Sequence, residues 1–113
     1  MTMPRLEHVN TTVDDLDRTL RFLAAAMPEW RVRGGSTMDW YGKPIRWVHV
    51  GSDEQYLALQ SGGEGAGLDS RAHATGVKQV GIAVASVDTV VARLAAAGFD
   101  VDHWSGDTPH RRS

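Results

Sequence analysis

The sequence predicts an α+β fold built from paired βαβββ modules, of which the second is incomplete. An internal repeat is the main evidence, because residues 8–27 align with residues 79–98 and seven of the twenty aligned pairs are identical. In each copy an alternating apolar segment comes before a segment with a helical apolar period, which predicts a strand followed by an amphipathic helix. A pseudo-twofold axis between the modules would make His8 and Gln79 symmetry mates on equivalent strands.

Composition limits the classes of function. A chain of 113 residues with a formal net charge of −2 is expected to form a single domain, residues 1–113. Its lysines and arginines are scattered, which argues against nucleic acid or an anionic membrane as a partner. No apolar run approaches the roughly 20 residues that cross a bilayer, and no signal-peptide pattern is present, so we expect a cytoplasmic protein. The lack of cysteine excludes disulfides, thiolate metal sites and a cysteine nucleophile.

The first module is predicted over residues 1–60 and begins with a strand at residues 6–13. At Asp14 and Asp15 the alternation gives way to a helical period. Aspartates at a helix start accept hydrogen bonds from free backbone amides and favour the positive end of the helix dipole. We expect the helix to end before Pro28, with four apolar residues on one side: Leu16, Leu20, Leu23 and Met27.

Three further strands are predicted in this module. A short strand is expected at residues 30–33, with the glycines at 34–35 as a turn. Another turn is predicted at residues 42–44, and a hairpin follows with strands at residues 45–50 and 55–60. The module therefore has the order strand, helix, strand, strand, strand.

Residues 61–76 contain five glycines and few apolar side chains, which predicts a linker between the modules. A glycine-rich phosphate loop is the alternative, but it needs a strand before it and a helix directly after it. No helical pattern follows these glycines, so the linker is favoured.

The second module, residues 77–113, is predicted to begin with a strand at residues 77–84. Ser86 is expected to cap a helix at residues 87–97, and Gly98 to end it in the left-handed conformation that helix C-termini favour.

After this helix only one further strand is predicted, at residues 101–104, where a duplicated module should have three. Missing strands would leave an open sheet edge, which favours aggregation unless another chain covers it. We therefore expect a homodimer.

Alternation along the strands divides their side chains between two faces. One face is apolar and suited to packing under the helices: Val9, Val48, Val50, Leu57, Leu59, Val80, Ile82 and Val84. The other is polar and aromatic: His8, Asn10, Ile45, Trp47, His49, Tyr56, Ala58, Gln60, Gln79 and Gly81. A curved sheet would turn this second face into a partly polar pocket for a small molecule.

A purely structural interpretation competes for each of these polar residues. The polar face of an antiparallel sheet is often only solvated, which would leave Asn10 and the glutamines without a role. His49 and Tyr56 could be a cross-strand pair that contributes about 0.2–1 kcal/mol to stability. A lone strand histidine such as His8 is more often structural than a metal ligand, and its symmetry with Gln79 adds weight to the ligand interpretation.

Three segments carry a family resemblance: Leu6-Glu7-His8-Val9-Asn10 before an aspartate-led helix, the strand Gln55–Gln60 and the strand Gln79–Val84. Together they closely resemble the vicinal oxygen chelate superfamily, which includes glyoxalase I, bleomycin and fosfomycin resistance proteins and extradiol dioxygenases. The resemblance covers most of the chain. It implies two βαβββ modules that form a cup around a divalent metal, which chelates vicinal oxygen atoms of the substrate.

The resemblance also assigns metal-ligand positions. It implies His8 as the ligand on the first strand and Gln79 as its counterpart, where histidine is common and glutamine binds transition metals more weakly. The family's carboxylate on the fourth strand falls at Ala58, which cannot ligate; Tyr56 and Gln60 are the nearest substitutes on the same face. The family's last ligand, a glutamate, would lie beyond the end of this sequence.

Two functions follow from the resemblance. The first is a metal-dependent enzyme of the lyase, isomerase or dioxygenase type that uses Mn, Fe, Ni or Zn as a Lewis acid, with His49 or Tyr56 as candidate catalytic groups. The second is a metal-free binding protein of the bleomycin-resistance type, which sequesters its ligand by stacking. For either function the expected substrate-binding residues are Asn10, Trp47, His49, Tyr56, Gln60 and Trp104.

Overall fold

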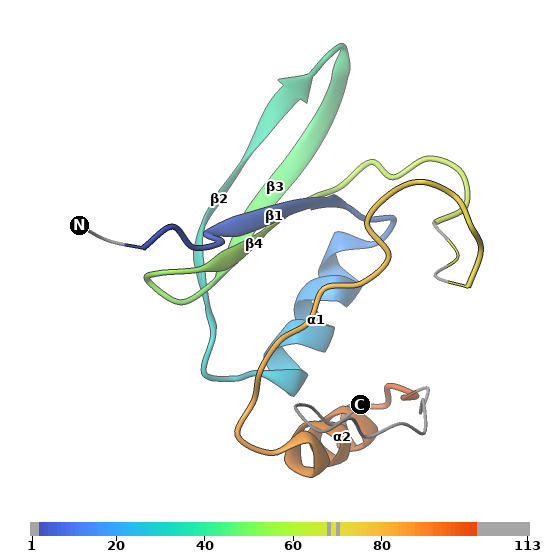
Figure 1. The fold of residues 1–113 in the computed structure, drawn as a ribbon. Coiled ribbons are helices and arrows are strands. Elements are labelled where there is room, and N and C mark those ends of the chain that lie inside the picture. The colour runs from blue at the N-terminus through green and yellow to red at the C-terminus, as the bar shows by residue number, and fades with distance from the viewer. Residues whose placement is uncertain (1–2, 68, 70, 102–113) are drawn as a thin grey trace.

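The computed structural model describes residues 3–67, 69 and 71–101. These residues form an α+β structure with a four-stranded mixed sheet and two helices (Figure 1). The elements are β1 (His8–Thr12), α1 (Leu16–Ala26), β2 (Arg31–Trp40), β3 (Lys43–Gly51), β4 (Tyr56–Gln60) and α2 (Val87–Ala96). The strand order is β1-β4-β3-β2, in which β1 runs parallel to β4 and the other pairs are antiparallel. The α+β class is confirmed.

The hydrophobic core lies between one face of the sheet and α1, which crosses that face (Figure 1). Strand alternation puts the apolar side chains of β3 and β4 on this face, as the sequence predicts. The α1 helix turns its apolar side toward them, and α2 packs against α1. The buried cluster contains Leu16, Leu23, Ala26, Met27, Val48, Val50, Leu59 and Leu94.

Both helices begin with the predicted caps. The side chain of Asp15 accepts a hydrogen bond from the amide of Arg18 at 3.0 Å, and that of Ser86 accepts one from Thr89 at 3.1 Å. Each bond satisfies a backbone donor that has no partner within the helix. After α2, Gly98 has a φ of 85°, the left-handed conformation expected there.

The β2 strand corrects two predictions about the first module. The sequence predicts a short strand that ends at Arg33, with a turn at Gly34-Gly35, but β2 continues through both glycines to Trp40. The turn lies instead at Tyr41 and Gly42, which have φ values of 49° and 92°. Two successive positive φ values match the right-handed twist of a two-residue hairpin, so β3 begins directly afterwards, at Lys43.

A β-bulge interrupts the pairing of β2 with β3. Val32 pairs with Val50 and Gly34 with His49, so Arg33 is the extra residue on the bulged strand. A bulge increases the local twist and redirects the side chain at that point. Arg33 therefore does not follow the regular alternation of side chains between the two faces of β2.

The predicted strand at residues 77–84 is wrong. These residues form no strand, and Val80 and Ile82 are 46% and 36% exposed rather than buried in the core. A strand needs a hydrogen-bonding neighbour, and β4 is the only described strand that pairs with β1. Residues 77–84 therefore have the alternating sequence of a strand but pair with no described strand.

The rest of the second module is only partly within the described residues. Residues 102–104 of the predicted strand at 101–104 lie outside them, as does the tail that follows. Among the described residues, no helix has the length and apolar character needed to cross a membrane.

Gly51 is the position at which this sheet is most sensitive to substitution. A Cβ there would overlap the carbonyl oxygen of Gln55 and lie 2.5 Å from the Cα of Tyr56. We expect Gly51→Ala to lower the free energy of unfolding by about 1–3 kcal/mol, because the backbone must shift. Urea denaturation measures this loss. Gly34→Ala is the control, because no atom lies within 4 Å of its added Cβ, and an equal loss in both variants would contradict the explanation.

Candidate functional site

Four aromatic rings are in continuous contact across the sheet face opposite α1, two of the contacts stacked and that of Trp47 with His49 tilted by 46°. The ring centroids of Trp47 and His49 are 4.7 Å apart, and those of His49 and Tyr56 are 4.6 Å apart at an interplanar angle of 29°. His8 stacks on Tyr56 at 4.9 Å and 10°. Because these distances are within the range for attractive ring pairs, the four side chains form one surface, called the ring stack below.

Strand register brings the ring stack together. His8 on β1 is the direct partner of Tyr56 on β4, and Tyr56 is the partner of Gly51 on β3. Since Gly51 has no side chain, the Tyr56 ring can lean along β3 to reach His49. Alternation then places Trp47 on the same face, two residues before His49.

A hollow of about 300 Å³ lies beside the ring stack on the same face. This volume is at the lower end of the range for small-molecule sites. Its lining combines a buried amide, two indole rings and a thioether with an imidazole. The lining residues are Asn10, Met38, Trp40, Trp47, His49, Ala58, Leu59 and Gln60.

The pKa of the His49 imidazole is held below its usual value. Burial against its ring neighbours is the main cause, and the positive charges of Arg33 and His8 add to it. His49 is therefore a neutral ring at pH 7, able to stack and to accept or donate one hydrogen bond.

Arg33 reaches the ring stack from the β2 bulge. The carbon at the centre of its guanidinium lies 4.1 Å from the centroid of the Tyr56 ring, a cation–π contact. Arg33 has no carboxylate within ion-pair distance among the described residues, whereas its neighbour Arg31 pairs with Asp53.

His8 is held by the carboxylate of Glu7, whose Oε1 lies 3.1 Å from the His8 Nδ1. The Tyr56 hydroxyl also donates to this oxygen, at a long 3.5 Å. Histidines that ligate metals commonly have such a carboxylate on their other ring nitrogen. The described residues contain no group of three His, Asp or Glu side chains able to hold a metal, so their donor set alone does not fit a catalytic metal site with three protein ligands.

Gln79, the second predicted metal ligand, lies in the exposed segment before α2. The neighbouring residues 80–86 and His8 line a second cavity of about 620 Å³, but Gln79 is not among the residues that line it. The symmetric pairing of His8 with Gln79 as metal ligands stays a prediction.

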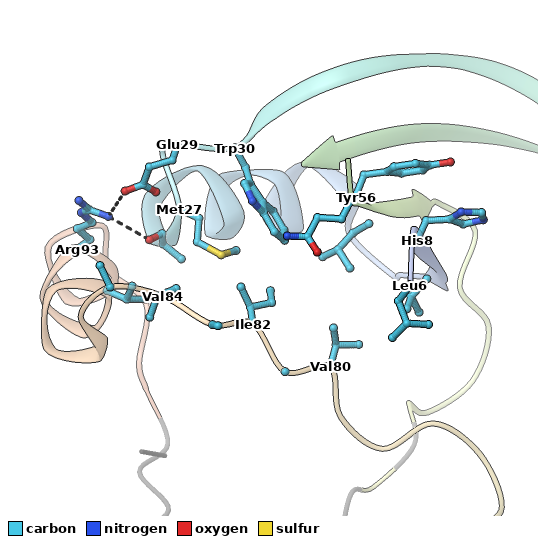
Figure 2. A pocket seen from close by; sticks show the side chains of 18 of the residues that line it. Leu6, His8, Met27, Glu29, Trp30, Tyr56, Val80, Ile82, Val84 and Arg93 are labelled. Atoms are coloured by element: carbon cyan, nitrogen blue, oxygen red, sulfur yellow. Dashed lines mark hydrogen bonds and ion pairs between the residues drawn. The ribbon is translucent and has the colours of Figure 1, made fainter. Parts of the chain in front are cut away.

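This second cavity, called the groove below, is mainly apolar. Val80, Ile82 and Val84 form one side of it (Figure 2). Met27 and Trp30 lie on the opposite side.

Arg93 bridges the two sides at one end of the groove. It donates to the carbonyl of Ala26 at 3.4 Å and pairs with Glu29 at 3.2 Å.

The polar face contains most of the predicted substrate-binding residues. Asn10, Trp47, His49 and Gln60 all line the hollow, and Tyr56 stacks on His49. Trp104 lies outside the described residues.

The sequence analysis missed three residues of this face: Arg33, Met38 and Trp40. All three lie on β2, whose length was underestimated because Gly34-Gly35 resembles a turn. The spacing of Met38 and Trp40, two residues apart before a turn, is the signal that could have extended the strand.

A scan against protein-family models finds no match to this chain, and a search of the curated proteins finds no significant similarity.

The lowered pKa of His49 predicts a pH-dependent stability. Above about pH 6.5 the ring is neutral in both the folded and unfolded states. As the pH falls below this value the unfolded state takes up the proton first, so stability decreases until the folded-state pKa is reached. We expect His49→Gln to lose less stability than the wild type between about pH 7.5 and about pH 5.5 in urea denaturation. His73→Gln, at an exposed linker position, is the control and should lose as much stability as the wild type over the same pH range.

Proposed function

We propose that the polar face is the ligand site of a cytoplasmic binding protein of the vicinal oxygen chelate type, which holds a planar small molecule by stacking and without turnover. The observation that carries this proposal is the ring stack beside the hollow. Trp47 and His49 belong to both, so a planar ligand in the hollow can extend the stack.

The hollow supports the same proposal through its polar groups. Gln60 is only 6% exposed and lines the hollow beside Ala58. A side-chain amide in a pocket orients a ligand by donating and accepting hydrogen bonds. Asn10 offers a second amide from β1.

Features of the two helices support the paired-module part of the proposal. Asp15 and Ser86 occupy equivalent positions in the internal repeat and cap their helices through the same hydrogen bond. Leu23 and Leu94 are also equivalent, and both are buried in the one hydrophobic core. These two pairs of equivalent residues thus have equivalent roles in the two helices.

A metal-dependent enzyme of the lyase, isomerase or dioxygenase type is the second candidate. It is favoured by the contact between Glu7 and His8, which resembles the carboxylate that orients a ligating histidine. Further ligands for Mn, Fe, Ni or Zn would have to come from outside the described residues, so the stacking function has the stronger support.

We also propose a homodimer with the groove at its interface. The segment at residues 77–84 has the alternation of a strand, and three of its apolar side chains face an open groove. The β1 strand lies at the edge of the described sheet, where its backbone groups are available for pairing. Strand addition from a second copy would satisfy these groups and bury the groove.

The stacking function predicts that Trp47 contributes to ligand affinity. We expect 2-naphthamide, a neutral planar probe, to bind the wild type, and Trp47→Leu to weaken it by about tenfold, since ring pairs contribute about 0.5–1.5 kcal/mol beyond burial. Trp47→Phe keeps a ring and should retain most of the affinity. Isothermal titration calorimetry measures both. Stoichiometric metal in the same samples that is lost in His8→Ala would favour the enzyme instead.

The homodimer is tested at two exposed apolar positions. Ile82 lines the groove, whereas Val77 is 72% exposed and does not line it. We expect Ile82→Lys to shift the protein from dimer to monomer in sedimentation velocity, because a charge cannot be buried unpaired. Val77→Lys is the matched control and should remain dimeric. A monomeric wild type would reject the proposed interface.

A further inference from the structure

We propose that the ligand of the ring stack is an aromatic carboxylate, whose ring lies against Trp47 and His49 and whose carboxylate is bound by Arg33. This inference rests on the proposed function and adds the charge and class of the ligand. It follows from where the β2 bulge places Arg33, from the charges around it, and from the order of groups along the face.

The contacts of Arg33 leave its N–H donors available among the described residues. Its guanidinium carbon lies 4.1 Å from the centroid of the Tyr56 ring, and the side chain is exposed and forms no ion pair there. A guanidinium can bind a carboxylate through two parallel hydrogen bonds. Stacking on Tyr56 also restricts the long side chain, so less conformational entropy is lost when an anion binds.

Arg33 forms no ion pair among the described residues, although its charge helps to lower the pKa of the Asp53 carboxyl. Asp53 is paired with Arg31, and Glu7 contacts His8 and the Tyr56 hydroxyl. Each nearby carboxylate therefore has another partner. Arg33 is the permanently charged group that acts on the His49 ring, and its positive charge favours an anion beside that ring.

The order of groups on the face fits an aromatic carboxylate. Arg33 contacts Tyr56, Tyr56 stacks on His49, and His49 contacts Trp47 at the hollow. A ligand with a flat ring at the hollow and its carboxylate directed along the stack would meet both parts. A simple inorganic anion would contact only Arg33. A neutral aromatic ring would contact only the ring stack.

The test compares 2-naphthoate with its neutral isostere 2-naphthamide by isothermal titration calorimetry at about pH 7.5, where the carboxylate is fully ionised. In the wild type we expect 2-naphthoate to bind at least about tenfold more tightly. Arg33→Gln should remove this preference and leave 2-naphthamide within about twofold of its wild-type affinity. Arg33→Lys keeps the charge and should keep part of the preference. Arg21→Gln, the same charge change on an exposed position of α1, is the matched control and should change neither affinity.

Three results would overturn the inference. The wild type could bind the two probes with equal affinity, Arg33→Gln could keep the wild-type preference for 2-naphthoate, or Arg33→Gln could lose affinity for both probes equally. The wild-type comparison needs no substitution, so it holds even if Arg33→Gln is unstable. If neither probe binds the wild type, the proposed function fails as well. If 2-naphthamide binds without any preference for the anion, only the carboxylate assignment fails.

Discussion

The register between β3 and β4 determines the rest of this structure. With Gly51 opposite Tyr56, alternation sends Val48, Val50 and Leu59 to the helix side and His49 and Tyr56 to the other. Because side chains alternate with a period of two, a slip of one residue would exchange the two faces and expose the core. The same register therefore builds the hydrophobic core and the ring stack, and it leaves no room for a Cβ at Gly51, which would overlap Gln55 and Tyr56.

The two faces of the sheet are stabilised by different forces. On the helix side, burial of α1 and Leu94 of α2 against the strands supplies the hydrophobic driving force. On the polar face, ring contacts and the cation–π contact of Arg33 hold exposed or half-buried groups whose net contribution to stability is small. Polar and aromatic groups that add little to folding are available for binding, which is why the stack and not the core is the candidate site.

The sequence predicts the local features of this chain well and the non-local ones poorly. The caps at Asp15 and Ser86 and the left-handed Gly98 depend on neighbouring residues, and the structure has all three. The length of β2 and the position of Arg33 depend instead on pairing with β3 across a bulge, which no local pattern encodes. Residues 77–84 show the same limit, because alternation reveals the capacity to form a strand and says nothing about the presence of a neighbour. The polar face was predictable because it needed only alternation within β1, β3 and β4.

The ring stack and the groove are physically connected through His8 and Tyr56, which line the groove and also belong to the stack. His8 lies on β1, the edge strand of the described sheet, and Tyr56 is its direct partner on β4. Packing in the groove would limit the motion of Tyr56 and, through their contact, of Arg33. Ligand binding must otherwise order these side chains itself, at a cost of about 0.5–1.5 kcal/mol for each immobilised one. Filling the groove would therefore reduce the ordering that the proposed ligand site requires of Tyr56 and Arg33.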